Sequence, residues 1–266
     1  SVNISYSAGV QNSYIAFNCS YGPFSDPNVR KAAACAIDDD AIALATKGEG
    51  HYETAKAIDY NTDEFAYYND DWAELNDSLD SYDYDVEKAK EYLAESSYPD
   101  GFECTMPTCG MFEKEAQAIQ YYLGQIGITV NLETVTISDY YQYAYGVMQN
   151  DDGYRDYDLI SFAWFPDYAD PSAYLMIYYS ENAGIGGSNI SAYVNKDFDA
   201  LYEAAKGQSG DERNETLMEA YSMVVDDCAA DFICYNGPSA AVNSAYSVDM
   251  PAMWFWNFQF TQVTKN

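Results

Sequence analysis

The sequence has little positive charge and almost no histidine. It carries 12 lysines and arginines against 43 aspartates and glutamates, a net charge of −31, and its one histidine is His51. Such a field repels nucleic-acid phosphates and anionic lipids, so neither is expected as a partner. The chain also has no Gly-x-Ser-x-Gly, His-Glu-x-x-His or phosphate-loop motif, so the common hydrolase signatures are missing.

Long apolar runs are missing as well. The longest uncharged stretches, residues 232–248 and 250–264, contain polar residues and proline, and they fall short of the roughly 20 apolar residues of a membrane-spanning helix. The chain opens Ser-Val-Asn-Ile-Ser-Tyr, without Met and without a signal-peptide pattern. We therefore expect a mature form or a segment of a longer protein.

The six cysteines are not spaced as metal ligands. None forms Cys-x-x-Cys, so zinc-finger and haem sites are excluded, and no metal or cofactor is expected. The spacings of Cys104 with Cys109 and of Cys228 with Cys234 permit local disulfides, which would indicate an oxidising exterior. Buried free thiols are an equal alternative for each cysteine.

Hydrophobic periodicity and turn residues predict strands and helices in alternation. We expect strands at 13–18, 102–106, 128–135, 159–164 and 232–235, with short strands within 240–248. We expect helices at 27–37, 38–45, 86–95, 115–126, 197–205 and 211–227. Asp38 is expected to cap the second helix, and Asp83 or Asp85 the third. The last helix should have a core stripe of Leu217, Ala220, Tyr221 and Val224. Residues 51–82 are polar and aperiodic and predict a long surface excursion. The pattern indicates a layered α/β fold around a mostly central sheet.

One strand ends in a carboxylate with aromatic neighbours. The strand predicted at 159–164 stops at Pro166, which leaves Asp167 exposed between Phe165 and Tyr168. A carboxylate at the end of a strand can hold a cation while aromatic rings cover the apolar part of the same ligand. The abundance of tyrosine, 28 residues, suits such mixed surfaces but names no site.

The neighbouring carboxylate has a different interpretation. Asp170 precedes Pro171, and this order is typical of the capped first turn of a helix. An ordinary strand-to-helix connection, with no ligand, is therefore the alternative interpretation of the whole stretch.

Six segments resemble, in order, the signature segments of one family. They are residues 24–38 (F-x-D-x-x-V-R-x-A-x-x-x-A-I-D), 82–102 (Y-D-x-x-K-A-K-x-L-L, then Y-P-D-G-F), 118–130 (L-x-x-I-G-I-x-V), 157–171 (Y-D-x-x-x-x-x-W, then D-P), 189–201 (N-x-x-x-Y-x-N-x-x-F-D-x-L) and the acidic-Arg pair at 212–213. No single segment is specific, but they occur in the same order as in the family, and the resemblance extends over about residues 15–235. The chain resembles the extracellular solute-binding proteins, family 5, of oligopeptide, dipeptide and nickel ABC importers.

The resemblance implies a fold and a domain organisation. The expected fold is an α/β periplasmic-binding-protein-like lobe of class II, type C, with a mixed central sheet flanked by helices. Residues 1–266 would form a single C-terminal lobe, and the N-terminal lobe of the two-lobed family would be absent. Hinge strands leading to that lobe are expected near 13–18 and 256–263.

The resemblance also implies a ligand site. In peptide-binding members, the acid three positions after a tryptophan accepts the α-ammonium of the peptide, and the strand before it pairs with the peptide backbone. The residues that match this pattern, or lie beside it, are Phe162, Ala163, Trp164, Phe165, Asp167 and Tyr168. Some members carry a basic residue where this chain has Ser161, and the nearest cation, Arg155, is expected outside the cleft.

Three functions are open. The first is the substrate-binding component of an ABC importer, located outside the cytoplasm as a surface lipoprotein or in the periplasm. Its partners would be an oligopeptide or another ammonium-bearing solute, the permease subunits and the missing lobe, although sugars, opines and nickel chelates also bind to members of this family. The alternatives are a glycoside or peptide hydrolase using Asp167 and Asp170, and an acidic calcium-binding surface module.

Overall fold

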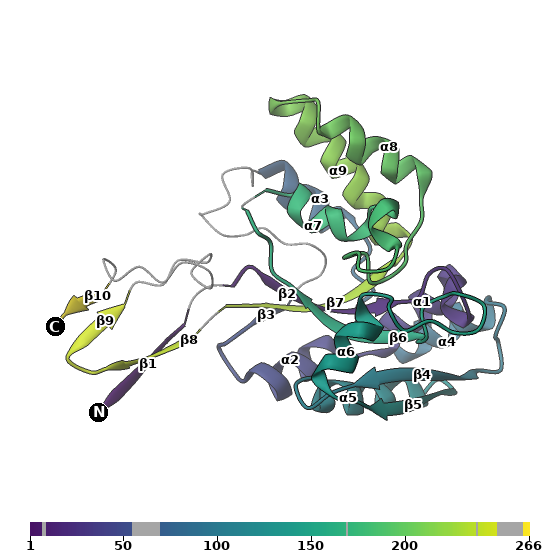
Figure 1. The fold of residues 1–266 in the computed structure, drawn as a ribbon, viewed down its shortest axis with the longest axis horizontal. Helices are drawn as coiled ribbons and strands as arrows, with labels where there is room; N and C mark the ends of the chain where they lie inside the picture. Colours follow the sequence, from purple (N-terminus) through teal and green to yellow (C-terminus); the bar gives the residue numbers. More distant parts are fainter. Residues whose placement is uncertain (7–8, 55–69, 169, 238, 249–262) are drawn as a thin grey trace.

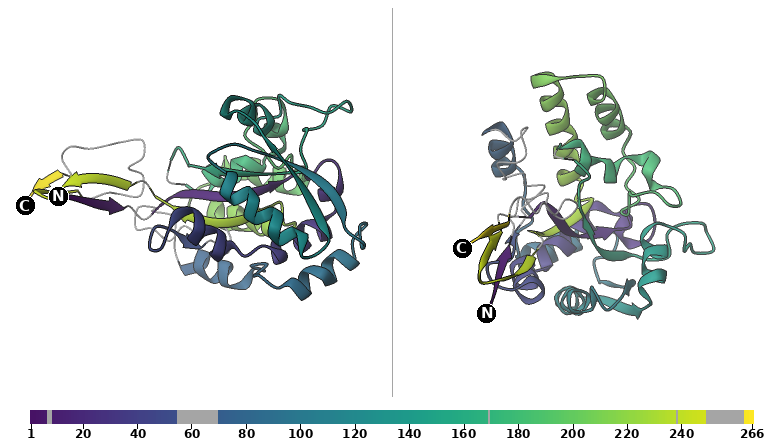
Figure 2. Two further views of the ribbon diagram at one scale, coloured as in Figure 1. Left: turned by 90° about the horizontal axis from the view of Figure 1, so that it is seen from below. Right: turned by 60° about the vertical axis from the view of Figure 1, so that its left-hand side comes forward.

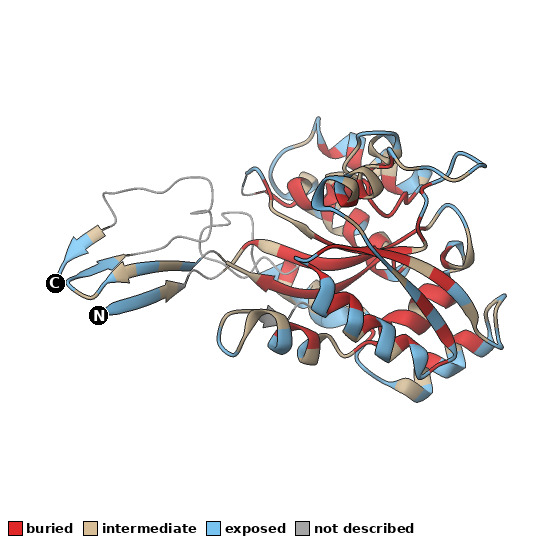
Figure 3. Ribbon diagram, turned by 60° about the horizontal axis from the view of Figure 1, so that its bottom comes forward, coloured by how far each residue is buried: buried red, intermediate tan, exposed pale blue. Residues whose placement is uncertain are grey.

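A four-stranded antiparallel sheet forms the centre of the structure (Figure 1). The computed structural model describes residues 1–6, 9–54, 70–168, 170–237, 239–248 and 263–266. Across the sheet the order is β3, β7, β2, β6, with bounds Glu53–Thr54, Ala230–Asn236, Gln11–Phe17 and Leu159–Trp164. β2 and β7 are buried along nearly their whole length, because helices cover both faces of the sheet (Figure 3). β6 is an edge strand of this sheet.

A parallel pair of strands adjoins the central sheet. β4 (Phe102–Thr108) and β5 (Ile128–Thr134) pair along their full lengths. Their connection is the amphipathic helix α5 (Glu113–Gly124). Gly101, just before β4, has no room for a side chain, since a Cβ there would lie 2.1 Å from the carbonyl oxygen of Gly127. The expected α/β fold is confirmed, and its parallel and antiparallel pairings occupy adjoining sheets.

Helices α1 (Pro27–Ala36), α2 (Asp39–Lys47) and α4 (Val86–Ala94) lie with α5 on one side of the central sheet (Figure 1). The predicted caps are present: Asp38 accepts a hydrogen bond from the amide of Ala41, and Asp85 accepts from two amides of α4. The buried alanines of α1 let it pack closely against α4.

The opposite side carries α7 (Ser172–Leu175), the short 3-10 turns η2 (Met176–Tyr178) and η3 (Ser180–Ala183), and the hairpin of α8 (Lys196–Ala205) and α9 (Gly210–Asp226). The core stripe predicted for the last helix is confirmed, because Leu217, Ala220, Tyr221 and Val224 are all fully buried.

Helix α3 (Asp70–Ser78) was not expected, since residues 51–82 were predicted to be an aperiodic excursion. Its Trp72 is fully buried, and the indole nitrogen donates a hydrogen bond of 2.7 Å to the side-chain oxygen of Asn214 on α9. Contacts with α9, rather than a local periodic pattern, therefore hold this helix. Residues 55–69 of the predicted excursion lie outside the described residues.

Two strand pairs form an arm that projects from the rest of the molecule (Figure 2). β1 (Val2–Tyr6) pairs with β8 (Ser239–Asn243), and β9 (Tyr246–Val248) pairs with β10 (Val263–Lys265). The strand expected at 13–18 lies in the central sheet as β2, and β1 of the arm precedes it in the sequence. Residues 256–262 of the other expected hinge strand lie outside the described residues.

Two further findings bear on the sequence-based expectations. All six cysteines are free thiols, so the alternative without disulfides applies in this structure. Of the helices that the structure describes, none is both long enough and apolar enough to cross a bilayer.

Two carboxyl groups lie where α2 packs on β7, that of the buried Asp231 and that of the half-buried Asp39. Asp231 is 5% exposed, and its Oδ2 has no hydrogen-bond partner among the described residues; the same holds for Oδ1 of Asp39. Burial raises the pKa of Asp231 to about 8. Burial, and then the nearby charge of Asp231, also raise the pKa of Asp39. Asp231 therefore holds its proton in the folded state over a range where the unfolded chain has lost it.

This proton makes stability pH-dependent in a defined direction. Protonated Asp231 contributes to the free energy of unfolding. This contribution is fully present below the ordinary pKa of 3.8 and is lost as the pH rises to about 8. We predict that the free energy of unfolding of Asp231→Asn, relative to that of the wild type at the same pH, increases across this window by at most about 1.4 kcal/mol per pH unit. Denaturant unfolding at several pH values would test this. Asp40→Asn, at an exposed position of α2, is the control, and identical pH profiles for wild type and Asp231→Asn would contradict the assignment.

Candidate functional site

The candidate residues lie at the end of edge strand β6 and in the loop that follows it. Phe162 is buried, Ala163, Trp164 and Phe165 are half-buried, and Asp167 and Tyr168 are exposed. The order of exposure is the one expected for a strand that emerges from the core and ends in an accessible carboxylate. The structure therefore brings the predicted residues together on one short segment.

Trp164 is held by the helix on the other side of the loop. Its indole nitrogen donates a hydrogen bond of 2.8 Å to the carbonyl oxygen of Ala173 in α7. This contact spans the loop that carries Asp167, so the two ends of the loop are fixed relative to each other. A loop closed in this way holds its exposed carboxylate close to the end of β6.

Among the described residues, hydrogen-bond partners cover the first half of the outer edge of β6. Asp158, just before β6, exchanges hydrogen bonds with Thr105 of β4: the Asp158 amide donates to the Thr105 carbonyl at 3.1 Å, and its side chain accepts from the Thr105 amide at 2.7 Å. Further along, the hydroxyl of Tyr140 donates to the carbonyl oxygen of Ser161. These partners occupy the edge as far as Ser161.

The main chain of Ala163 faces the open part of this edge. β6 pairs with β2 in antiparallel register, with Ala163 opposite Ser13. Since the Ser161 carbonyl bonds to Tyr140 rather than to β2, the main-chain groups of Ser161 point away from the sheet. Backbone groups alternate along a strand, so those of Ala163 point the same way. The described residues provide no hydrogen-bond partner for the N–H and C=O of Ala163 on this side.

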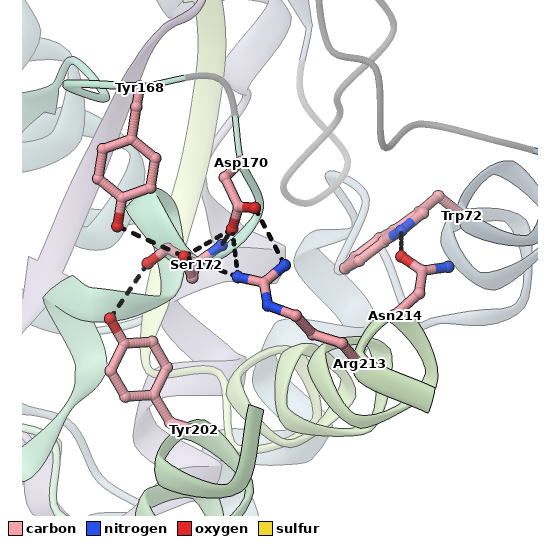
Figure 4. A network of polar contacts seen from close by, with 7 residues as sticks. All are labelled: Trp72, Tyr168, Asp170, Ser172, Tyr202, Arg213 and Asn214. Atoms are coloured by element: carbon pink, nitrogen blue, oxygen red, sulfur yellow. Dashed lines mark hydrogen bonds and ion pairs between the residues drawn. The ribbon is translucent and has the colours of Figure 1, made fainter. Parts of the chain in front are cut away.

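Asp170 is not available to a ligand in the same way. Its two carboxylate oxygens accept a bidentate pair of bonds from Arg213 of α9 at 2.8 and 3.0 Å, and one of them also accepts from the amide and hydroxyl of Ser172 (Figure 4). Burial alone would raise the pKa of Asp170, but the bonds from Arg213 and Ser172 outweigh it and hold the pKa below its ordinary value. The predicted capping role is thus accompanied by an ion pair.

Breaking this ion pair should destabilise the connection between the loop and α9. The side chains of Arg213 and Asp170 are 21% and 12% exposed, so we predict a loss of about 2 kcal/mol for Arg213→Met, below the cost of a fully buried pair. Lys90→Met, which breaks an exposed pair with Glu87, is the control and should change little. The free energy of unfolding measures both, and equal effects would contradict the proposed role of Arg213.

Three tyrosine rings contact the Phe162 side chain. Tyr141 and Tyr145 are stacked, with ring centroids 6.1 Å apart and planes 13° apart, and both meet Phe162 edge-on at 6.1 and 6.0 Å. Tyr14 meets it from β2 at 6.3 Å. The two stacked rings come from helix α6 (Ile137–Ala144) and the residue after it. The sequence showed only a tyrosine-rich stretch here.

Arg155 holds the end of α6 in place. It is 4% exposed and donates to the carbonyl oxygens of Ala144, Ala183 and Asn189 at 2.6, 3.1 and 2.7 Å. The guanidinium thereby joins the last turn of α6 to the loop between η3 and α8. Arg155 was expected to lie outside the cleft, and the structure places it in the interior with a structural role.

The structure offers no support for a metal centre among the residues that it describes. No group of three or more His, Cys, Asp or Glu side chains there is placed to hold a metal ion. An open acidic groove does lie between α3 and α9, with Asp71, Glu74 and Glu215 among its lining residues. It is formed by other elements than the aromatic and carboxylate residues of β6.

Comparison with known sequences identifies the family. Residues 1–185 match the family model described as "Bacterial extracellular solute-binding proteins, family 5 Middle". The chain belongs to this family. Heme-binding protein A of Haemophilus influenzae is 29% identical over 230 residues, which are 83% of this chain and 38% of that protein. The dipeptide-binding protein of Escherichia coli is 27% identical over 236 residues, or 86% of this chain and 41% of that protein.

A solved structure gives the same relationship. The periplasmic binding protein DppA of Helicobacter pylori, in complex with the peptide STSA, superposes with a TM-score of 0.82 at 25% identity. The match covers 99% of this chain and 49% of that one. The family-5 fold inferred from the sequence is therefore confirmed, and this chain spans half or less of the length of these relatives.

Proposed function

We propose that this chain is a ligand-binding lobe of the extracytoplasmic receptor of an ABC importer, and that its ligand is a peptide with a free α-ammonium group. The observation that carries the proposal is the open edge of β6 at Ala163, followed four residues later by the exposed carboxylate of Asp167. An extended peptide adds to such an edge through main-chain bonds, whatever its side chains. Asp167 would then accept the ammonium at the end of the peptide.

The names of the relatives agree with a peptide ligand, and one of them adds heme to the possible ligands. Peptides are named for the relatives from Escherichia coli and Helicobacter pylori, and heme for the one from Haemophilus influenzae. Heme lacks the ammonium and the extended backbone for which Ala163 and Asp167 are suited. We therefore favour peptides for this chain.

Among the described residues, neither Ser161 nor an arginine is placed to bind the ligand's carboxylate. Ser161 is uncharged, and the three buried or half-buried arginines of the described residues already bond to protein groups: Arg30 and Arg155 to backbone carbonyls, Arg213 to Asp170. A carboxylate in the cleft would otherwise face a strongly negative chain. We propose that the cation which binds it comes from a second lobe.

The greater length of the relatives also supports a second lobe. Residues 1–266 would be the C-terminal lobe, and the projecting arm of β1, β8, β9 and β10 would be the connection to the rest of the receptor. Closure of two lobes on the ligand would remove water from the bond to Asp167 and strengthen it. The permease subunits would then receive the closed receptor outside the cytoplasm, either in the periplasm or at a lipid-anchored surface.

The role of Asp167 is tested by removing either charge. In the full-length protein, we predict that Asp167→Asn weakens the binding of tri-alanine roughly 10- to 150-fold, because a charge-assisted hydrogen bond contributes about 1.5–3 kcal/mol. N-acetylated tri-alanine should bind the wild type as weakly as tri-alanine binds the variant. Isothermal titration calorimetry measures all four combinations.

The decisive measurement combines Asp167→Asn with N-acetylated tri-alanine. Once Asp167 is Asn, acetylation of the peptide should have little further effect, since the two charges act on one interaction. Asp211→Asn, at an exposed position of α9, is the control and should bind normally. Additive losses from the variant and from acetylation would show that Asp167 and the ammonium do not meet.

A further inference from the structure

The helix beside the open edge of β6 presents an apolar, aromatic surface. Ile137, Tyr141 and Tyr145 are spaced by four residues, so they follow one face of α6 and its last turn. Ile137 is 46% and Tyr141 42% exposed, while Tyr145 is half-buried. Exposed apolar residues in a contiguous group mark interaction sites more often than isolated ones do.

This surface lies next to Ala163. Tyr140, in the middle of α6, bonds to the Ser161 carbonyl at the outer edge of β6, so the helix runs along that edge. Tyr141, the next residue, and Tyr145, about one turn further on, both contact Phe162, the residue before Ala163. The two tyrosine rings are therefore placed beside the position where the main chain of Ala163 is open.

The geometry of strand pairing decides which part of a ligand meets these rings. A ligand residue that pairs with Ala163 through its backbone has neighbours opposite Phe162 and Trp164. Side chains directly opposite each other project from the same face of the sheet, about 5 Å apart. The ligand side chain opposite Phe162 therefore points toward the face that Phe162 shares with Tyr141 and Tyr145.

We propose that Phe162, Tyr141 and Tyr145 form a subsite for an apolar side chain of the ligand, with a preference for aromatic rings. The subsite rests on the proposed peptide-binding function and adds a selectivity to it. The stacked tyrosines offer ring faces and edges for offset or edge-to-face contacts. The rings carry no charge, so the subsite favours phenylalanine over aspartate or lysine at that position of the peptide.

The anchoring of α6 makes this surface a fixed one. Arg155 bonds to the carbonyl of Ala144, and the amide of Gly186 donates to the carbonyl of Tyr145 at 2.7 Å. The backbone on both sides of the last turn is thus tied to the loop after η3. A preorganised wall loses little conformational freedom when a ligand binds, so its contacts appear in the affinity.

The test is a phenylalanine scan in the full-length protein. Affinities are measured for tetra-alanine and for its four variants with one phenylalanine. We expect phenylalanine at one position, or at positions two apart, to strengthen binding roughly three- to tenfold over alanine, and the adjacent positions to show no gain. The double variant Tyr141→Ala, Tyr145→Ala should reduce that gain to below twofold while tetra-alanine still binds.

Matched variants separate the rings from other effects. Replacing both tyrosines by phenylalanine should keep the gain, because the rings remain and only the hydroxyls are lost. Tyr121→Ala removes an exposed tyrosine from a different aromatic cluster, with Tyr122, and should also keep it. If the double alanine variant does not fold, Tyr141→Ala alone, at an exposed position, should still lower the gain.

The outcomes distinguish the subsite from the function on which it rests. If the wild type binds tetra-alanine but gains nothing from phenylalanine at any position, or if the gain persists in the alanine variants, the subsite is wrong and the function stands. If none of the five peptides binds to the wild type, the proposed function is wrong, and the subsite fails with it.

Discussion

The candidate site depends on which main-chain groups along the outer edge of β6 have hydrogen-bond partners. An edge strand exposes main-chain donors and acceptors that must find partners in the protein, in water or in another chain. In β6 the first half of this edge bonds to β4 and Tyr140, while the main chain of Ala163 has no partner on this side within the described part of the chain. The neighbouring elements do not close the gap; they fix its position, through Trp164 on α7 and through α6 alongside.

The two carboxylates near Ala163 differ in their bonding partners, and the sequence alone does not show this difference. Asp170 is bonded to Arg213 and Ser172, whereas Asp167, three residues earlier, is exposed. The positive groups are few, and the arginines near the interior serve backbone carbonyls or Asp170. In a chain with net charge −31, the exposed carboxylate of Asp167 at the strand end forms no ion pair among the bonds that the described residues show.

Much of the fold could be predicted because its determinants are local. The bounds of β6, the caps Asp38 and Asp85, and the buried stripe of α9 follow from periodicity and turn residues, and the structure agrees with them. Helix α3 could not be predicted, because its Trp72 is fixed by Asn214, 142 residues away. The same reason hid the Arg213–Asp170 pair and the aromatic wall on α6, whose meaning appears only when distant segments meet.

In the proposed function, a ligand completes the edge of β6. The most direct measurement is a crystal structure of the full-length protein with bound tetra-alanine. We expect the peptide backbone to form hydrogen bonds with the N–H and C=O of Ala163. The α-ammonium should lie within about 3 Å of the Asp167 carboxylate. A peptide bound elsewhere, or one whose ammonium lies against another group while Asp167 faces solvent, would contradict it.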